Sequence, residues 1–332
     1  LIYSPLLHHN LDIVIRHEVE ATMRDLLEKE NFDLVPGITY RSQDNKIMRN
    51  PNRKIFVDLD TLPFPARNLL KNKLYTRPDS GKPLTVIMTS RGCPFRCTFC
   101  LAGELSDYNL ILRDPFKVVD EIEECVIKYN IKDFFFYADT FTYNKEWVVT
   151  LCNEILRRGL RIKWGANSRA DTLDEERLVA MKKSGCEVLG FGLESGRQET
   201  LNKSKKGITL QDSENAIRLC KKYGIKSYMV FMIGFPWETR EHVIDTISFA
   251  LKLDGDFVDF TVVYPYPGTK LYQMAKDMNL FDETELCGHD ISRAMQKTAF
   301  LSTEELTSLR KYAIRRFYLR PGYIVKKLAQ IR

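Results

Sequence analysis

The sequence predicts an α/β protein built on a partial (β/α)6 barrel of the TIM type, with a remnant and linker before it and a helical extension after it. Two observations indicate this fold. From residue 84 onward, short apolar runs alternate with segments of helical period, and polar residues recur at the C-terminal end of each apolar run. Alternating strands and helices favour a parallel sheet with right-handed crossovers. Polar residues gathered at the strand ends favour a barrel over an open sheet.

The six expected strands are nearly continuous apolar runs, as in a sheet that is covered on both faces. We place them at residues 84–89, 133–137, 162–166, 188–193, 227–233 and 257–263. The segments between them carry apolar residues three or four positions apart, such as Val118, Ile122 and Val126, which is the pattern of helices that pack on a sheet.

The regions on either side of the barrel are less regular. Residues 11–16 are expected to form a strand, and residues 19–30 a helix with Ala21, Leu26 and Leu27 facing inward. Turn residues flank two extended runs, 38–41 and 46–49, which predicts a hairpin. A proline-containing linker follows it at residues 58–67. Three helices are expected after the barrel, at residues 271–278, 303–318 and 324–331. The chain thus divides into residues 1–35, 36–83, 84–270 and 271–332.

The composition is that of a globular protein, because 44% of the 332 residues are hydrophobic and 28% are charged. No apolar run approaches the roughly 18 residues of a membrane span, so we expect no transmembrane segment. Residues 1–7 lack a basic leader, so we expect no signal peptide, and a first residue other than methionine indicates a fragment or a processed form. Eight unevenly spaced cysteines indicate a reducing compartment, and we predict a cytoplasmic location.

The most informative motif is Cys93-x3-Cys97-x2-Cys100, which follows the first barrel strand. Three thiolates this close together can point at one cluster from a compact loop. Iron–sulfur clusters are usually held by four cysteines, so three cysteines leave one iron open to a substrate or cofactor. A zinc site with a distant fourth ligand, either Cys125 or His289, is the alternative.

The surrounding stretch, Arg91-Gly92-Cys93-Pro94-Phe95-Arg96-Cys97-Thr98-Phe99-Cys100, resembles the radical S-adenosylmethionine (SAM) superfamily, and the resemblance covers about residues 84–270. It implies a [4Fe-4S] cluster on the three catalytic cysteines, with SAM chelating the remaining iron. An electron from a donor such as flavodoxin or ferredoxin then cleaves SAM to methionine and a 5′-deoxyadenosyl radical. The protein positions and shields this chemistry.

The resemblance also implies cofactor-binding roles for residues at the strand ends. Phe99 flanks the SAM adenine. Asp139 accepts from the SAM ammonium, because an ammonium offers only donors. Arg169 pairs with the SAM carboxylate, and Glu194, with the adjacent Ser195, binds the ribose hydroxyls.

Further along the chain, Gly234 and Pro236 belong to a stretch that backs the adenine, and Tyr264 lies near the substrate mouth. Each of these assignments has a structural alternative: Arg169 and Glu194 as surface ion pairs, and Tyr264 as a plug in the barrel. Their shared placement at the C-terminal ends of strands favours the functional interpretation.

Residues 11–70 resemble the junction between a cobalamin-binding Rossmann domain and the barrel of cobalamin-dependent radical SAM enzymes. The usual Arg-Gly-Glu-Gly-Glu reads Arg16-His17-Glu18-Val19-Glu20, and the Asp-x-His-x-x-Gly loop that lodges the cobalamin base is absent from the sequence. We therefore interpret residues 1–35 as the remnant of such a domain, in a chain that is truncated or has lost its cobalamin domain. We expect this remnant to bind cobalamin poorly on its own and to pack against the barrel through Ile13, Ile15, Leu26 and Leu27.

The leading function is methylation of an unactivated carbon with cobalamin, and a cobalamin-free radical rearrangement or coupling is the second. A zinc- or nucleic-acid-binding module is an alternative from another class, which needs a fourth ligand and an aromatic, basic surface. The net charge of +6 is small, so the expected substrate is a small molecule or a lipid-like compound rather than a nucleic acid.

Overall fold

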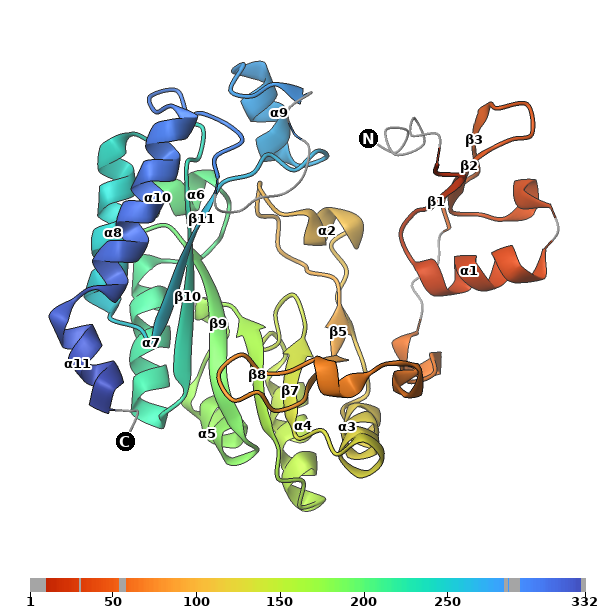
Figure 1. Ribbon diagram of the computed structural model, residues 1–332, viewed down its shortest axis with the longest axis horizontal. Helices are drawn as coiled ribbons and strands as arrows, with labels where there is room; N and C mark the ends of the chain where they lie inside the picture. The colour runs from red at the N-terminus through yellow and green to blue at the C-terminus, as the bar shows by residue number, and fades with distance from the viewer. Residues whose placement is uncertain (1–9, 30, 54–57, 284–285, 287–292, 330–332) are drawn as a thin grey trace.

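The computed structural model of the chain describes residues 10–29, 31–53, 58–283, 286 and 293–329. A curved six-stranded sheet forms the centre, and helices cover its outer side (Figure 1). The strand order is β11-β10-β9-β8-β7-β4, with every pair parallel, so neighbours in the chain are neighbours in the sheet. Strands β4 and β11 are the two edges, which confirms the predicted partial barrel.

The strands and covering helices lie close to their predicted positions. The strands are β4 (Leu84–Met88), β7 (Asp133–Tyr137), β8 (Lys163–Ser168), β9 (Cys186–Glu194), β10 (Lys226–Ile233) and β11 (Phe257–Val262). The helices are α3 (Pro115–Tyr129), α4 (Lys145–Arg157), α5 (Glu175–Lys183), the short α6 (Gln198–Lys203), α7 (Leu210–Tyr223) and α8 (Arg240–Leu253).

The barrel core is aromatic where β7 meets β8. Phe136 and Trp164 are almost fully buried, and their rings stack with centroids 4.7 Å apart. Rings of this size remove large apolar areas from water and fix the spacing between strand and helix layers. Cys125, Cys152 and Cys220 are fully buried in the same core, where they pack as small side chains.

The N-terminal part forms a small unit of its own, which we call the N-terminal unit (residues 11–53). Three strands pair in the order β1-β2-β3, all antiparallel, and one helix packs on them. The elements are β1 (Ile13–Ile15), α1 (Val19–Glu28), β2 (Ile38–Arg41) and β3 (Ile47–Arg49). The predicted hairpin is therefore confirmed, and a boundary after residue 35 cuts through this sheet.

Two expectations about the N-terminal unit are wrong. Ile13, Ile15 and Leu26 pack against a cluster of Val35, Ile38 and Tyr40 rather than against the barrel. The reason is that β1 finds a strand partner in β2, so its apolar residues are covered locally. Leu27 does not face inward, since it is 80% exposed.

The linker after the N-terminal unit covers one edge of the barrel sheet. Arg67, in the 3-10 turn Arg67–Leu69, donates from Nη2 to the carbonyl of Val86 at 2.9 Å and from Nε to Thr85 Oγ1 at 3.3 Å. It also pairs with the buried Glu121 of α3 at 2.6 Å. The exposed backbone of β4 thus receives a side-chain donor instead of another strand.

The C-terminal helices cover the other edge. They are α9 (Lys270–Asp277), α10 (Thr303–Tyr318) and α11 (Pro321–Ala329). The Tyr318 hydroxyl accepts from the Val258 N–H at 2.9 Å and donates to the Val258 carbonyl at 2.7 Å, while Arg310 Nε donates to the Phe260 carbonyl at 2.6 Å. None of the described helices has the length and apolar character needed to cross a bilayer.

We expect Tyr318→Phe to lower the free energy of unfolding by about 1–3 kcal/mol, because both backbone groups of Val258 lose their partner. Urea unfolding measures this change. Tyr312→Phe is the matched control, since Tyr312 lies on the same helix and is 46% exposed. Equal stability of the two variants would contradict the edge-covering role.

Candidate functional site

The three predicted cysteines lie on one loop at the C-terminal end of β4. This cysteine loop (residues 92–100) runs from the short strand β5 (Ser90–Arg91), which pairs with β6 (Ile111–Leu112), to the short helix α2 (Leu101–Leu105). Cys93, Cys97 and Cys100 are free thiols of intermediate burial. The loop therefore presents three unmodified thiols at the catalytic end of the barrel.

Backbone constraints fix where the loop begins and ends. Gly92 has a φ of +88°, and a Cβ there would lie 2.1 Å from the carbonyl oxygen of Asn109, so only glycine fits. The N–H of Cys93 donates to Ser106 Oγ at 3.3 Å. At the other end, Cys100 caps α2, and its sulfur accepts from the N–H of Ala102 at 3.4 Å.

The middle of the loop is tied to two other parts of the barrel. The N–H of Thr98 donates to the carbonyl of Ser204, and its carbonyl accepts from the N–H of Leu271, each at 2.9 Å. Ser204 follows α6, and Leu271 lies in α9. Segments that are far apart in the sequence thus hold the loop in place.

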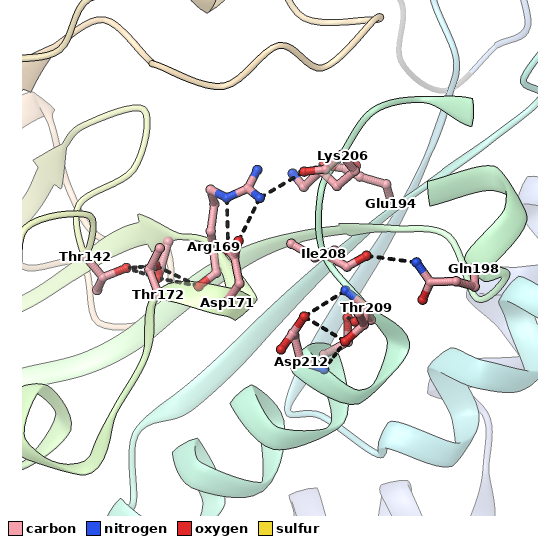
Figure 2. A network of polar contacts seen from close by, with 12 residues as sticks. Thr142, Arg169, Asp171, Thr172, Glu194, Gln198, Lys206, Ile208, Thr209 and Asp212 are labelled. Carbon is pink, nitrogen blue, oxygen red and sulfur yellow. Dashed lines mark hydrogen bonds and ion pairs between the residues drawn. The ribbon is translucent and has the colours of Figure 1, made fainter. Parts of the chain in front are cut away.

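A buried arginine lies against the loop. Arg169 follows β8, is 4% exposed, and places its Cζ 3.5 Å from the centroid of the Phe95 ring. Asp171 binds it in a fork, Nε to Oδ1 at 3.0 Å and Nη2 to Oδ2 at 2.9 Å, and Nη2 also donates to the Lys206 carbonyl at 2.9 Å (Figure 2). Arg169 is therefore a buried and oriented charge rather than a surface ion pair.

A buried lysine–glutamate pair lies next to it. Lys206 Nζ is 2.7 Å from Glu194 Oε1, and both side chains are less than a tenth exposed (Figure 2). Glu194 ends β9 in the left-handed region, with a φ of +64°. A Cβ on Gly192 would lie 2.4 Å from Glu194 Oε1 and 3.0 Å from Lys206 Nζ, so glycine makes room for the pair.

Opposing effects act on the thiols. Burial raises the pKa of the Cys97 thiol, while the positive charges of Lys206 and Arg169 act to lower it. Burial also raises the pKa of Cys100, as does the charge of its neighbours Cys97 and Cys93. The sulfurs thus lie within electrostatic range of each other and of two cations. This donor set fits an iron–sulfur cluster, whose thiolate ligands gain from nearby positive charge.

The zinc alternative loses one of its proposed ligands. Cys125 is fully buried in the barrel core on α3, and His289 lies outside the described residues. Over the described ranges, no group of three or more His, Cys, Asp or Glu side chains, the three loop cysteines included, is placed to hold a metal ion.

Asp139 lies beside the cysteine loop, after the end of β7. Burial raises the pKa of its carboxyl group, and the nearby backbone N–H of Gly92 lowers it. The predicted ammonium acceptor is thus next to the first cysteine.

Phe99 joins the loop to the end of β10. Its ring lies 5.9 Å from that of Phe235, edge to face, in a cluster with Val263 and Leu271. Gly234 precedes Phe235 with a φ of +95°, and its carbonyl accepts from the Gln296 amide at 3.0 Å. The buried Pro236 accepts from the N–H of Ala299 at 2.9 Å.

The remaining two predicted residues have local partners. Ser195 is fully buried; its hydroxyl lies 3.2 Å from that of Thr246 on α8 and accepts from the N–H of Arg197 at 3.2 Å. The Tyr264 ring lies 4.9 Å from that of Tyr266, and its hydroxyl donates to the Leu286 carbonyl at 3.2 Å. Ser195 is thus engaged by α8. Burial raises the pKa of Tyr266, and the charges of Tyr264 and Cys100 raise it further, so the tyrosine pair lies near the cysteine loop.

Sequence reasoning missed Lys206, Phe95 and Glu238. Lys206 belongs to the lysine-rich run at residues 203–206, which reads as a solvated surface. Two features of the sequence could have revealed Lys206: the glycine that follows it, Gly207, and Glu194, the acid at the end of the preceding strand. Glu238 comes four residues after Gly234, and it is the acceptor for the N–H groups of Gly234 at 2.8 Å and Phe235 at 3.1 Å.

The comparisons with known proteins agree with this geometry. Residues 87–250 match the family profile of the radical SAM superfamily. An uncharacterized methyltransferase from Pyrococcus horikoshii is 35% identical over 322 residues, which cover 96% of this chain and 70% of that protein. The anaerobic magnesium-protoporphyrin IX monomethyl ester cyclase of Rubrivivax gelatinosus is 28% identical over 325 residues, 95% of this chain but only 58% of that protein.

Among solved structures, the radical SAM methyltransferase TsrM from Kitasatospora setae, with cobalamin and a [4Fe-4S] cluster bound, has the same fold. The TM-score is 0.67 at 20% identity, over 83% of this chain and 55% of that one.

Glu238 makes stability depend on pH. It is fully buried, and burial raises its pKa from 4.5 to about 7. Because the folded state binds this proton more tightly than the unfolded state, the stabilising contribution is present below about pH 4.5 and is lost as the pH rises through about 7. We expect Glu238→Gln to remove up to about 3 kcal/mol of this pH dependence.

Urea unfolding at about pH 5 and about pH 8 measures the effect. Glu199→Gln, at an exposed position on α6, is the control. Parallel pH profiles for the wild type and Glu238→Gln would contradict the prediction.

Proposed function

Because the chain belongs to the radical SAM superfamily, we propose that it binds a [4Fe-4S] cluster on Cys93, Cys97 and Cys100, cleaves SAM reductively and methylates an unactivated carbon with cobalamin. One observation carries the proposal: three free thiols lie on one loop at the C-terminal end of the barrel. Two buried cations, Arg169 and Lys206, and two carboxylates, Glu194 and Asp139, surround that loop. When bound, the cluster supplies the electron that breaks the SAM sulfur–carbon bond.

The surrounding residues would bind and orient SAM. Asp139 offers an acceptor to the ammonium beside Cys93. Arg169 and Lys206 are candidates for the carboxylate, and Lys206 is the new one, because its ammonium acts directly on the pKa of Cys97. Arg169 donates from Nε and Nη2 to Asp171, and from Nη2 also to the Lys206 carbonyl. Among the described residues, Nη1 has no such acceptor, so it is available for a ligand.

The walls of the site would keep water from the radical. Phe99, Phe235, Val263 and Leu271 form an apolar cluster where the cysteine loop meets the ends of β10 and β11. Phe99 is positioned there to flank the adenine. Excluding water from such a site prevents side reactions of reactive intermediates.

The methylation and cobalamin parts of the proposal rest on the relatives. The 35% identical relative is named a methyltransferase. The second relative is named a cyclase, and ring closure is a coupling reaction, so radical coupling is the second candidate. A small or lipid-like substrate and a flavodoxin or ferredoxin donor complete the proposal. The chain spans 55–70% of the compared proteins' lengths.

We expect these residues alone to bind cobalamin poorly, so the cobalamin part of the proposal applies to a longer parent protein that holds this cofactor. A Rossmann-type corrin site needs several βα units, whereas the N-terminal unit contains an antiparallel three-stranded sheet and, in its described part, one α-helix.

The first test removes the cluster ligands. We expect the Cys93→Ala/Cys97→Ala/Cys100→Ala variant to fold but to hold no [4Fe-4S] cluster and to make no 5′-deoxyadenosine from SAM and reductant. Iron and sulfide analysis, visible absorption and mass spectrometry measure these outcomes. Cys220→Ala is the control, because Cys220 lies on α7 with its side chain buried in the barrel core, outside the cysteine loop. A four-iron cluster in the triple variant would overturn the assignment.

The second test concerns SAM binding. We expect Glu194→Gln in the cluster-loaded protein to weaken SAM binding by about 1–3 kcal/mol, because a neutral amide accepts the ribose hydroxyls less strongly. Calorimetry measures the affinity. The substitution also leaves buried Lys206 without its carboxylate, so melting is measured in parallel, with Glu194→Gln/Lys206→Met as a charge-balanced companion. Lower stability with unchanged SAM affinity would remove Glu194 from the site.

A further inference from the structure

The residue before the cysteine loop reaches away from the barrel. Arg91 ends β5 and directly precedes Gly92 and Cys93. Its Nη2 lies 2.7 Å from Glu20 Oε1 and its Nη1 lies 3.2 Å from Glu20 Oε2, and Nη1 also bonds Glu18. One guanidinium thus holds two carboxylates at the start of α1, with a bidentate fork on Glu20. We call Glu18, Glu20 and Arg91 the carboxylate clamp.

The N-terminal unit presents these two glutamates rigidly. The preceding Arg16 is 6% exposed, its N–H donates to the Gly37 carbonyl at 2.8 Å, and its Nη2 donates to the Ile38 carbonyl at 2.9 Å. His17 turns the chain with a φ of +63°. Thr22 is fully buried and donates to the Glu18 carbonyl at 3.2 Å. The start of α1 is therefore fixed to the hairpin.

The cysteine loop has little freedom to absorb a shift of Arg91. Gly92 is confined by its neighbours, because a Cβ there would lie 2.1 Å from the carbonyl oxygen of Asn109 and 2.8 Å from Ser106 Cβ. Arg91 itself is paired with Ile111 across the short β5–β6 ladder. A displacement of the Arg91 backbone would therefore move Gly92 and Cys93 together.

Stability alone does not account for the clamp. The three side chains are 17–31% exposed, and ion pairs this close to solvent contribute little free energy, typically about 0–1 kcal/mol. The clamp instead fixes the position of Arg91 relative to the start of α1, because a forked guanidinium sets both the direction and the distance of its carboxylate partner. Arg91 lowers the pKa of Glu20, mainly through its hydrogen bond, so the pair is charged at neutral pH.

We propose that the carboxylate clamp is a positioning device that lets the N-terminal unit set the geometry of the cluster site. Arg91 acts through Gly92 on Cys93, and Glu18 and Glu20 act through Arg91. The inference rests on the proposed function, since it presumes a cluster and SAM at the cysteine loop.

The test compares Arg91→Gln, Glu18→Gln/Glu20→Gln and their combination in the reconstituted full chain. The readouts are the electron paramagnetic resonance spectrum and midpoint potential of the reduced cluster, the SAM dissociation constant, and the melting temperature. We expect a changed spectrum and a SAM dissociation constant raised by roughly threefold to fivefold, with melting nearly unchanged. The combined variant should be no worse than either parent, because both remove the same contact. Arg91→Lys should keep part of the wild-type spectrum and SAM affinity, because a lysine retains the positive charge but not the fork.

Arg53→Gln is the matched control. Arg53 pairs with Asp25 of α1 and bonds Thr22 at 3.0 Å, so its loss weakens the same unit without touching the clamp. Three outcomes would overturn the proposal: wild-type cluster and SAM readouts in Arg91→Gln, additive losses in the combined variant, or an equal effect of Arg53→Gln. A wild-type chain that holds no cluster would instead refute the proposed function, whatever the variants do.

Discussion

The site depends on positive charge buried beside half-buried thiols. A thiolate loses hydration when it is buried, which is why burial raises the pKa values of Cys97 and Cys100. Lys206 and Arg169 offset part of this cost, and each is itself balanced by a carboxylate, Glu194 or Asp171. Buried charges persist only when they are paired and hydrogen-bonded. The carboxylates are thus as necessary to the site as the cations.

This charge arrangement explains why the partners come from different strands. The cysteine loop follows β4 and β5, Arg169 follows β8, and Glu194 ends β9. Parallel strands bring their C-terminal ends to one edge, so charges distant in sequence meet without long connections. Lys206 completes the group from the loop between α6 and α7 and links to Arg169 through its carbonyl.

Much of the barrel could be predicted because burial on both faces produces uninterrupted apolar runs. The strand from Asp133 to Tyr137 has the predicted ends. The positions of the cysteine loop and Asp139 at strand ends could also be predicted, because spacing and strand-end position are visible in the sequence. Lys206 was missed because its burial depends on Glu194, an acid on another strand. Leu27 was misplaced because helical period alone does not say which apolar residues a neighbouring sheet will cover.

Side chains cover backbone at both edges of the barrel sheet, Arg67 along β4 and Tyr318 and Arg310 along β11. Open edges are templates on which further strands add, from the same chain or from another molecule. A tyrosine hydroxyl that occupies both backbone groups of Val258 denies an incoming strand its hydrogen bonds at that position. The sheet can therefore keep two edges without a neighbouring strand, and neither edge becomes a seam for self-association.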